Sequence, residues 1–158
     1  MTTFRTRLIF LGILCANNKG MLDDWLQYDW VGVPWWGESR YGGNGGLSLR
    51  RVSSIIAVLR HQQRQNFSEP EDVWLTERLG HLPNTQVANG SESMKFSAES
   101  IWYDEPLGYH TGGGGILAGG VWGSQEHRQH IWDYCPEMKI TLDMDASSYI
   151  PELCLTEW

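Results

Sequence analysis

The clearest pattern along the chain is a set of apolar positions with helical spacing between residues 51 and 65. Val52, Ile55, Ile56 and Leu59 fall at i, i+3, i+4 and i+7. This spacing places the four side chains on one face of an α-helix. We therefore expect a helix over about residues 51–65 whose apolar face lies in the core.

Two further helices are expected downstream. Ser68 and Glu71 have the spacing of a capping box, Pro70 suits a first helical turn, and Gly80 suits a helix end. These signals predict a helix that begins near Pro70. A shorter helix is expected over residues 127–134.

Other segments have the apolar character of strands. These are Arg7–Cys15, Asp29–Val33, Met94–Ser100 and Lys139–Leu142, while Gly45–Arg50 forms a strand or runs directly into the helix that follows. Strands that alternate with helices favour an α/β fold, in which a mostly parallel sheet is flanked by helices. Because no linker divides the chain, we expect one domain over residues 1–158.

Composition and charge limit the classes of partner. Hydrophobic residues make up 41% of the chain and charged residues 20%, with a net charge of -7. An acidic chain without a Lys/Arg run repels phosphate backbones, so we expect no nucleic-acid partner. The longest apolar run, from Leu8 to Ala16, is too short to span a membrane.

The cysteines and two short motifs bear on the compartment. Cys15, Cys135 and Cys154 allow one disulfide with a free thiol, or three free thiols. A Cys135–Cys154 disulfide is expected if the protein enters the secretory pathway. Asn66-Phe67-Ser68 and Asn89-Gly90-Ser91 match the N-glycosylation pattern, which weakly favours that route.

Three groups of residues are candidates for chemistry. The absence of a Cβ in Gly45 and Gly46 allows backbone to approach a ligand closely, or simply to turn. Glu71 and Asp72 stand at an expected helix N-terminus, which stabilises ionised carboxylates, although such acids more often only cap the helix. His110 is able to bind a metal when neutral.

Two other histidines, His127 and His130, have i, i+3 spacing in the third expected helix. A pair on one helix face could hold a metal ion, but no third ligand is evident from the sequence. We interpret them as solvated helix surface.

An ordered series of motifs resembles a known family. Its members are Tyr28–Trp35, Gly43–Arg50, Pro70–Trp74, Pro106–His110 and Ile131–Glu137. The series resembles a fungal glycosyltransferase-like family of unknown function within the GT-A superfamily. The resemblance covers nearly the whole chain and implies a partial GT-A-like, Rossmann-like domain.

The resemblance implies roles for particular residues. Asp72 is the expected catalytic base, and Glu71 is expected to orient the acceptor. The expected sugar-binding residues are Asn44, Gly45, Gly46, Trp35 and Trp36. His110 is the expected ligand of a divalent cation, Mn²⁺ or Mg²⁺. The implied partners are a nucleotide-sugar donor and a glycan or other hydroxyl acceptor.

The sequence departs from the family pattern near its start. The family has an acidic metal-binding residue before Ile13-Leu14-Cys15, whereas Phe10-Leu11-Gly12 precedes that tripeptide here. The upstream nucleotide-binding strands are also missing from this sequence. We therefore expect impaired sugar transfer, or a non-catalytic glycan-binding or scaffold protein. The implied location is the Golgi or another secretory compartment if the parent protein carries an N-terminal anchor.

One geometric test follows. If the resemblance holds, residues 43–46, Asp72 and His110 must converge on one cleft, because donor, acceptor and metal meet at one point. The Asp72 carboxylate is expected to face open space rather than its own helix. Trp35 or Trp36 is expected at the rim as a sugar platform.

Overall fold

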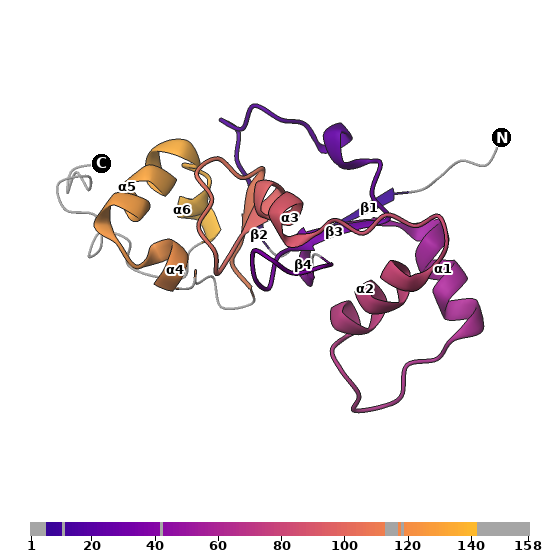
Figure 1. Cartoon of the computed structure of the whole chain (residues 1–158). Coiled ribbons are helices and arrows are strands. Elements are labelled where there is room, and N and C mark those ends of the chain that lie inside the picture. The colour runs from indigo at the N-terminus through magenta and orange to yellow at the C-terminus, as the bar shows by residue number, and fades with distance from the viewer. Residues whose placement is uncertain (1–5, 11, 42, 113–116, 118, 142–158) are drawn as a thin grey trace.

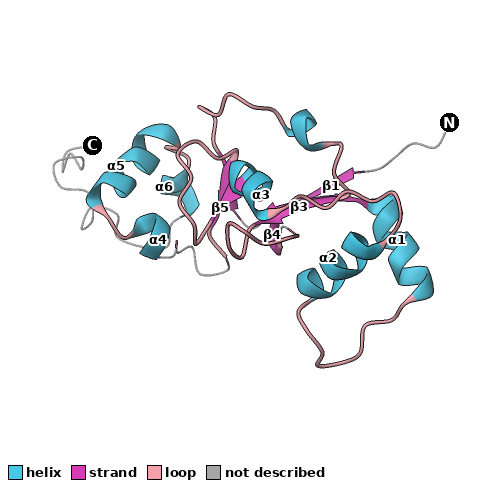
Figure 2. Cartoon of the chain, in the orientation of Figure 1, coloured by secondary structure: helices cyan, strands magenta, loops and turns pink. Residues whose placement is uncertain are grey.

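The protein is described by a computed structural model that places residues 6–10, 12–41, 43–112, 117 and 119–141. Strands occupy the middle of the molecule, with α4, α5 and α6 at one end and α1 and α2 at the other (Figure 1). Helices and small sheets together make a mixed α/β fold (Figure 2).

The strands are β1 Thr6–Phe10, β2 Gly12–Leu14, β3 Trp30–Val33, β4 Asn44–Arg51, β5 Ser97–Ala98 and β6 Gly108–His110. The helices are the 3-10 helix η1 Leu22–Trp25, then α1 Val52–His61, α2 Glu71–His81, α3 Gly90–Phe96, α4 Gly119–Trp122, α5 Gln125–Tyr134 and α6 Met138–Thr141.

The strands form two three-stranded sheets with the orders β1-β4-β3 and β2-β6-β5. Both pairings in the first sheet are antiparallel, as is β2 with β6, and β5 pairs with β6 in parallel. The expectation of a mostly parallel sheet is therefore wrong for the described strands. Its physical reason is the connectivity, because β3 returns to β4 through a loop instead of a crossover helix.

Several expected elements are corrected. The expected strand at Arg7–Cys15 is two strands, β1 and β2, which belong to different sheets. Residues 94–96 are the end of helix α3, so only the last part of the expected strand Met94–Ser100 is extended. Residues 139–141 lie in helix α6 instead of a strand. The segment Gly45–Arg50 does form a strand, and α5 confirms the helix expected at residues 127–134.

Helix α1 is present, but it turns a different face to the core than expected. Val58 is 1% exposed, whereas Ile56 is 41% and Leu59 57% exposed. Ile55 packs with Val58 against the core cluster that contains Trp74 of α2. The expectation that Ile56 and Leu59 are core residues is therefore wrong, because the packing against α2 selects one edge of a broad apolar face.

Helix α2 begins close to where it was expected, but its ends differ. Its N-cap is Pro70, without a side-chain cap, so the expected Ser68–Glu71 capping box is absent. Gly80 lies inside the helix instead of ending it. A Cβ at Gly80 would lie 2.3 Å from the Tyr41 ring, so the packing of that ring requires a residue without a side chain at position 80.

Three clusters of buried side chains form the core. The largest joins β2 and β6 to the helices α4, α5 and α6, the second lies between the β1-β4-β3 sheet and α3, and the third lies under α1 and α2. Asp29 is a buried polar residue between the last two clusters. It accepts hydrogen bonds from Gln86 N at 2.7 Å and from Ser54 Oγ, and it pairs with Arg51 at 3.4 Å.

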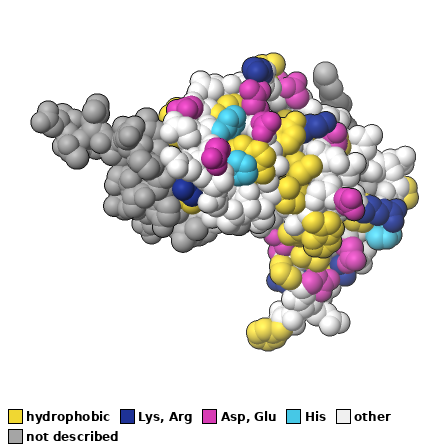
Figure 3. Space-filling view, turned by 60° about the vertical axis from the view of Figure 1, so that its left-hand side comes forward, with side chains coloured by type: hydrophobic (Ala, Val, Ile, Leu, Met, Phe, Trp, Pro, Cys, Tyr) yellow, Lys and Arg dark blue, Asp and Glu magenta, His cyan; other side chains and the backbone are white. Residues whose placement is uncertain are grey.

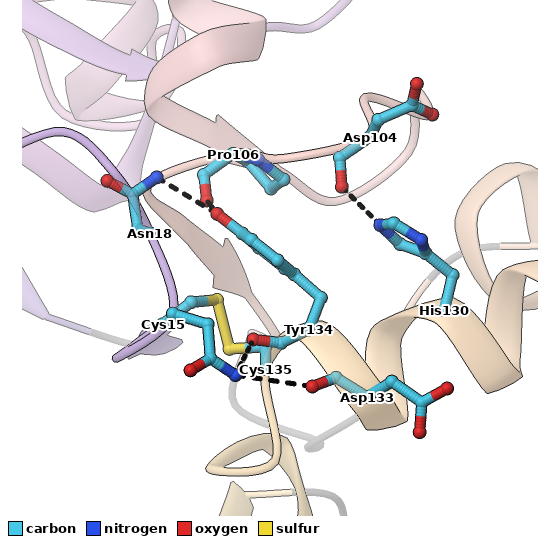
Figure 4. Close-up of a disulfide and its surroundings, with 9 residues drawn as sticks. Cys15, Asn18, Asp104, Pro106, His130, Asp133, Tyr134 and Cys135 are labelled. Carbon is cyan, nitrogen blue, oxygen red and sulfur yellow. Dashed lines mark hydrogen bonds between the residues drawn. A yellow bond between two sulfur atoms is a disulfide. The ribbon is translucent and has the colours of Figure 1, made fainter.

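A disulfide joins Cys15, which follows β2, to Cys135, which follows α5 (Figure 4). The two Cα atoms are 4.8 Å apart, and both residues are buried. The expected Cys135–Cys154 disulfide is wrong, because the Cys135 sulfur is bonded to Cys15. Cys154 lies outside the described residues.

Candidate functional site

The expected turn at residues 43–46 is largely strand, because Asn44, Gly45 and Gly46 are the first residues of β4. This segment, which we call the Gly43 turn, is fixed by hydrogen bonds from its own neighbourhood. Asn44 Oδ1 accepts from Gly46 N at 2.7 Å, and Ser48 Oγ donates to Gly45 O at 2.9 Å. Arg50 Nη2 donates to the same Gly45 carbonyl at 3.1 Å. Because β4 is the central strand of its sheet, this turn has a fixed position relative to the neighbouring elements.

The start of α2 lies directly against the turn. Asp72 Oδ2 accepts from Gly45 N at 3.0 Å, and Asp72 Oδ1 accepts from Val73 N at 2.8 Å. The neighbouring Glu71 forms an ion pair with Arg50. The expectation that Asp72 faces open space is wrong, since both of its oxygens hold backbone N–H groups. The physical reason is that the first N–H groups of a helix lack carbonyl partners.

His110 approaches the turn from the other sheet. It is the last residue of β6 and is 5% exposed. A Cβ at Gly46 would lie 2.0 Å from His110 Nε2. On its other side, His110 Nδ1 lies 3.1 Å from Glu99 Oε1. Asp72 thus lies against Gly45 and His110 against the neighbouring Gly46. The expected convergence of the two side chains on one cleft stays a prediction.

The glycines of this turn allow the chain's own side chains to pack closely. A Cβ at Gly43 would lie 2.2 Å from the Trp35 ring, and one at Gly45 would lie 2.3 Å from Arg50 Nη2. Gly46 is covered by His110 in the same way. The space where a Cβ atom would lie is therefore occupied by another side chain at each of the three glycines. Any ligand must therefore approach this turn from a direction other than the missing Cβ atoms.

The two expected sugar-platform tryptophans differ in exposure. Trp35 is half-buried against Gly43, and Trp36 is 62% exposed. Their ring centroids are 6.3 Å apart. Trp35 thus belongs to the cluster around the turn, and Trp36 presents its ring to solvent beside it.

The expected metal ligand has few partners. Among the described residues, no group of three or more His, Cys, Asp or Glu side chains is placed to hold a metal ion. His110 and Glu99 supply two such side chains. This set does not fit a divalent cation bound by the protein alone, so we derive no chemical step through one.

A second candidate site lies at the other end of the molecule. A hollow of about 720 Å³ is lined by Trp102, Tyr103, Asp104, Glu105 and His130. Figure 3 shows histidine and acidic side chains next to hydrophobic ones on a face turned from the view of Figure 1. Aromatic rings beside carboxylates are the chemistry that binds hydroxyl-rich ligands, because sugar C–H faces stack on the rings.

The walls of this hollow, which we call the Trp102 hollow, are held in place by α5. The Trp102 ring stacks on His127 with 3.6 Å between centroids, and Trp102 Nε1 donates to Asp104 Oδ1 at 2.7 Å. His130 Nε2 lies 2.5 Å from Asp104 O, toward which it points in Figure 4. His127 and His130, interpreted from the sequence as solvated helix surface, are partly exposed, and both rings also contact Trp102. No sequence signal linked Trp102 to residues of α5, because the contact is made by tertiary packing.

Below the hollow, Tyr134 links α5 to two distant segments. Its hydroxyl donates to Pro106 O at 2.7 Å and accepts from Asn18 Nδ2 at 3.0 Å (Figure 4). The Cys15–Cys135 disulfide lies next to it in the chain. These links hold the end of α5 against the segment that follows β2. The helix that carries His130 therefore has a fixed position beside the hollow.

No helix in the described part of the chain has the length and apolar character needed to cross a membrane. Residues 10–110 match the model of a family described as "Protein of unknown function (DUF5672)". No curated protein and no solved structure matches the chain.

Proposed function

The chain belongs to the DUF5672 family, and we propose that it is a glycosyltransferase-like protein of the GT-A type, whose activity is sugar transfer from a nucleotide-sugar donor to a hydroxyl acceptor. One observation carries the proposal. Asp72 of α2 is hydrogen-bonded to Gly45 and His110 of β6 packs on Gly46, so residues expected to share a site contact neighbouring positions of β4, which supports the proposal.

In this proposal Asp72 is the base. Its two oxygens accept hydrogen bonds from the backbone N–H groups of Gly45 and Val73, which fix the orientation of the carboxylate. A carboxylate has about four lone-pair positions, so an acceptor hydroxyl has room to bind as a third partner. Asp72 then takes the hydroxyl proton as that oxygen bonds to the anomeric carbon, and the nucleoside diphosphate leaves.

Glu71 and Arg50 have a supporting role in the proposal. The Arg50 guanidinium lies 4.0 Å from the centroid of the buried Trp30 ring, and it binds both Glu71 and the Gly45 carbonyl. This arrangement fixes the turn against the start of α2. Glu71 thereby positions the acceptor side of the site through Arg50. The divalent cation, with His110 as its expected ligand, stays a prediction.

A specific observation favours a second candidate, a glycan-binding protein without catalysis. Glu71 is engaged by Arg50, and both Asp72 oxygens are engaged by backbone groups. The Trp102 hollow has the aromatic and acidic lining that suits a glycan. Under this reading the Gly45–Asp72 contact is structural, and the hollow binds the ligand.

Calorimetric titration with UDP-glucose, UDP-galactose and GDP-mannose, each with Mn²⁺, tests the first candidate together with a transfer assay. We expect binding by the wild-type chain and a loss of transfer of roughly 10²–10⁴-fold in Asp72→Asn. Asp104→Asn is the matched control in the other site and should leave transfer unchanged. Equal transfer by Asp72→Asn and wild type would remove Asp72 as the base.

The same proteins separate the two candidates. If no nucleotide sugar binds, while a glycan array gives signals that Trp102→Ala abolishes and Trp36→Ala retains, the second candidate holds. If Trp36→Ala abolishes the signals instead, the glycan site lies beside the Gly43 turn.

A further inference from the structure

The connection between α1 and α2 projects away from the body of the molecule (Figure 1). It contains Asn66-Phe67-Ser68, and Asn66 lies exposed in a turn. Phe67 has a φ of 61° and a fully exposed ring. The connection is tied locally by Arg64, which donates to Glu69 O at 2.7 Å. The Asn66 side chain thus stands on a local loop with solvent around it.

A separate observation concerns the compartment in which the chain folds. The Cys15–Cys135 disulfide joins two buried sulfurs across 120 residues of sequence. Disulfides of this kind form and persist in oxidising compartments and are rare where thiols are kept reduced. N-linked glycans are attached in the same oxidising compartments of eukaryotic cells. The disulfide and the exposed motif are independent features, and both indicate that the chain folds in an oxidising compartment where N-linked glycans are attached.

From these two features we infer that Asn66 is an N-glycosylation site. Asn66 Nδ2 forms a bond to the anomeric carbon of an oligosaccharide carried on a lipid diphosphate. Nδ2 loses a proton, and the lipid diphosphate is the leaving group. A bulky, hydrated glycan at this position lies beside the exposed Phe67 ring and away from both candidate sites.

The structure also determines when the transfer takes place. Ser68 supplies the hydroxyl that the motif requires, and its Oγ is buried in the folded chain. We therefore expect the oligosaccharyltransferase, the enzyme that attaches the glycan, to recognise the motif before the α1–α2 connection has folded. The finished fold then accommodates the glycan, because the Asn66 side chain itself remains exposed.

The second motif of the same type provides a comparison within the chain. Asn89 is the N-cap of α3 and accepts from Glu92 N at 2.9 Å. A Cβ at Gly90 would lie 2.5 Å from Trp36 O, so the middle residue of this motif is packed against residues 36–37, while Asn89 and Ser91 are exposed. Asn89→Gln is therefore the matched control for Asn66→Gln.

The test uses the full protein isolated from its own cells. Peptide-N-glycosidase treatment in heavy-oxygen water converts a glycosylated asparagine into a labelled aspartate, which mass spectrometry assigns to a residue. We expect the label at residue 66. An unlabelled Asn66 in that peptide would overturn the inference.

Variants expressed with a secretion signal in eukaryotic cells give a second readout. Asn66→Gln and Ser68→Ala should each remove one glycosidase-sensitive mobility shift, and Asn89→Gln should retain it. Because the Asn66 side chain is exposed, secretion of Asn66→Gln should match wild type. A shift that survives both Asn66→Gln and Ser68→Ala would overturn the assignment.

Timing is tested with purified oligosaccharyltransferase and a lipid-linked oligosaccharide. The reduced, unfolded chain should accept the glycan at Asn66, whereas the oxidised, folded chain should not. Equal modification of both forms would show that the folded structure does not protect Ser68.

Discussion

The backbone N–H of Gly45 donates a 3.0 Å hydrogen bond to Oδ2 of Asp72, which ties the start of β4 to the first turn of α2. A hydrogen bond to a charged acceptor typically contributes about 1.5–3 kcal/mol. We expect Asp72→Ala to lower the unfolding free energy by about that amount. Asp72→Asn, which keeps an acceptor oxygen, should lower it less. Urea denaturation measures both, and an Asp72→Ala variant as stable as wild type would show that the contact is unimportant for stability.

Gly46 should not tolerate a larger residue. The Cβ of Gly46→Ala would lie 2.0 Å from His110 Nε2, which is far inside van der Waals contact. Because His110 is buried, its ring has little room to move, and we expect a loss of about 1–3 kcal/mol in unfolding free energy. Gly119→Ala is the control, since a Cβ there has no neighbour within 4 Å. Similar melting temperatures for the two variants would contradict the close contact.

Reduction of the Cys15–Cys135 disulfide should destabilise the fold strongly. The bond closes a long loop, and loss of a native disulfide of this kind typically costs about 2–5 kcal/mol. Cys15→Ser and Cys135→Ser should each show that loss in denaturant titrations. Cys154→Ser should have the same unfolding free energy as wild type, and Cys15 and Cys135 should remain disulfide-bonded in it. A stability loss in Cys154→Ser and Cys135→Ser, with Cys15→Ser unchanged, would mean that Cys154 is the true partner of Cys135.

Adjacent residues of α1 should respond very differently to truncation. Val58 is 1% exposed and Leu59 is 57% exposed. We expect Val58→Ala to cost roughly 2 kcal/mol, by analogy with other buried aliphatic truncations. Leu59→Ala should stay within about 0.5 kcal/mol of wild type, as exposed substitutions usually do. The reverse order in a thermal unfolding series would mean that the helix is rotated from the described orientation.

Tyr109 should make the fold sensitive to alkaline pH. Burial raises the pKa of the Tyr109 phenol above its usual range. Below about pH 10, the ordinary phenol pKa, the phenol is neutral in both states and its contribution is fully present. As the pH rises further, the unfolded chain loses the proton first, so the unfolding free energy falls until the folded phenol also ionises.

Tyr109→Phe isolates this contribution. Within the described part of the structure the Tyr109 hydroxyl is buried and has no hydrogen-bond partner. Its removal should therefore raise the unfolding free energy by about 1 kcal/mol at neutral pH. It should also flatten the decline between about pH 9 and pH 11. Tyr134, whose pKa is likewise raised by burial, remains in both proteins. An unchanged alkaline decline in Tyr109→Phe would assign the effect elsewhere.

One correction had a signal in the sequence that periodicity concealed. The segment Asn89-Gly90-Ser91-Glu92 has a favourable N-cap residue three positions before an acid, and in the structure Asn89 caps α3. The apolar residues that follow had indicated a strand at Met94–Ser100. Local capping decides the first part of that segment, which is helical through Phe96.

The sequence by itself determined the elements whose signals are local. The period of apolar residues indicated α1, a short helix was expected at residues 127–134, where α5 lies, and a strand was expected at Asp29–Val33, where β3 lies. The glycines, acids and histidine of the candidate site were also identified by residue type. These features depend on backbone preferences and on neighbours within a few positions.

Tertiary structure decided what depends on distant partners. The apolar residues of α1 cover a broad arc, and only contact with α2 buries Val58 and leaves Leu59 exposed. Pairing of β1 with β4, the Cys15–Cys135 disulfide and the stacking of Trp102 on His127 join segments with no local signal for one another. The same holds at Gly46, where close packing of β4 and β6 brings His110 onto a glycine that the sequence alone had marked as open to a ligand.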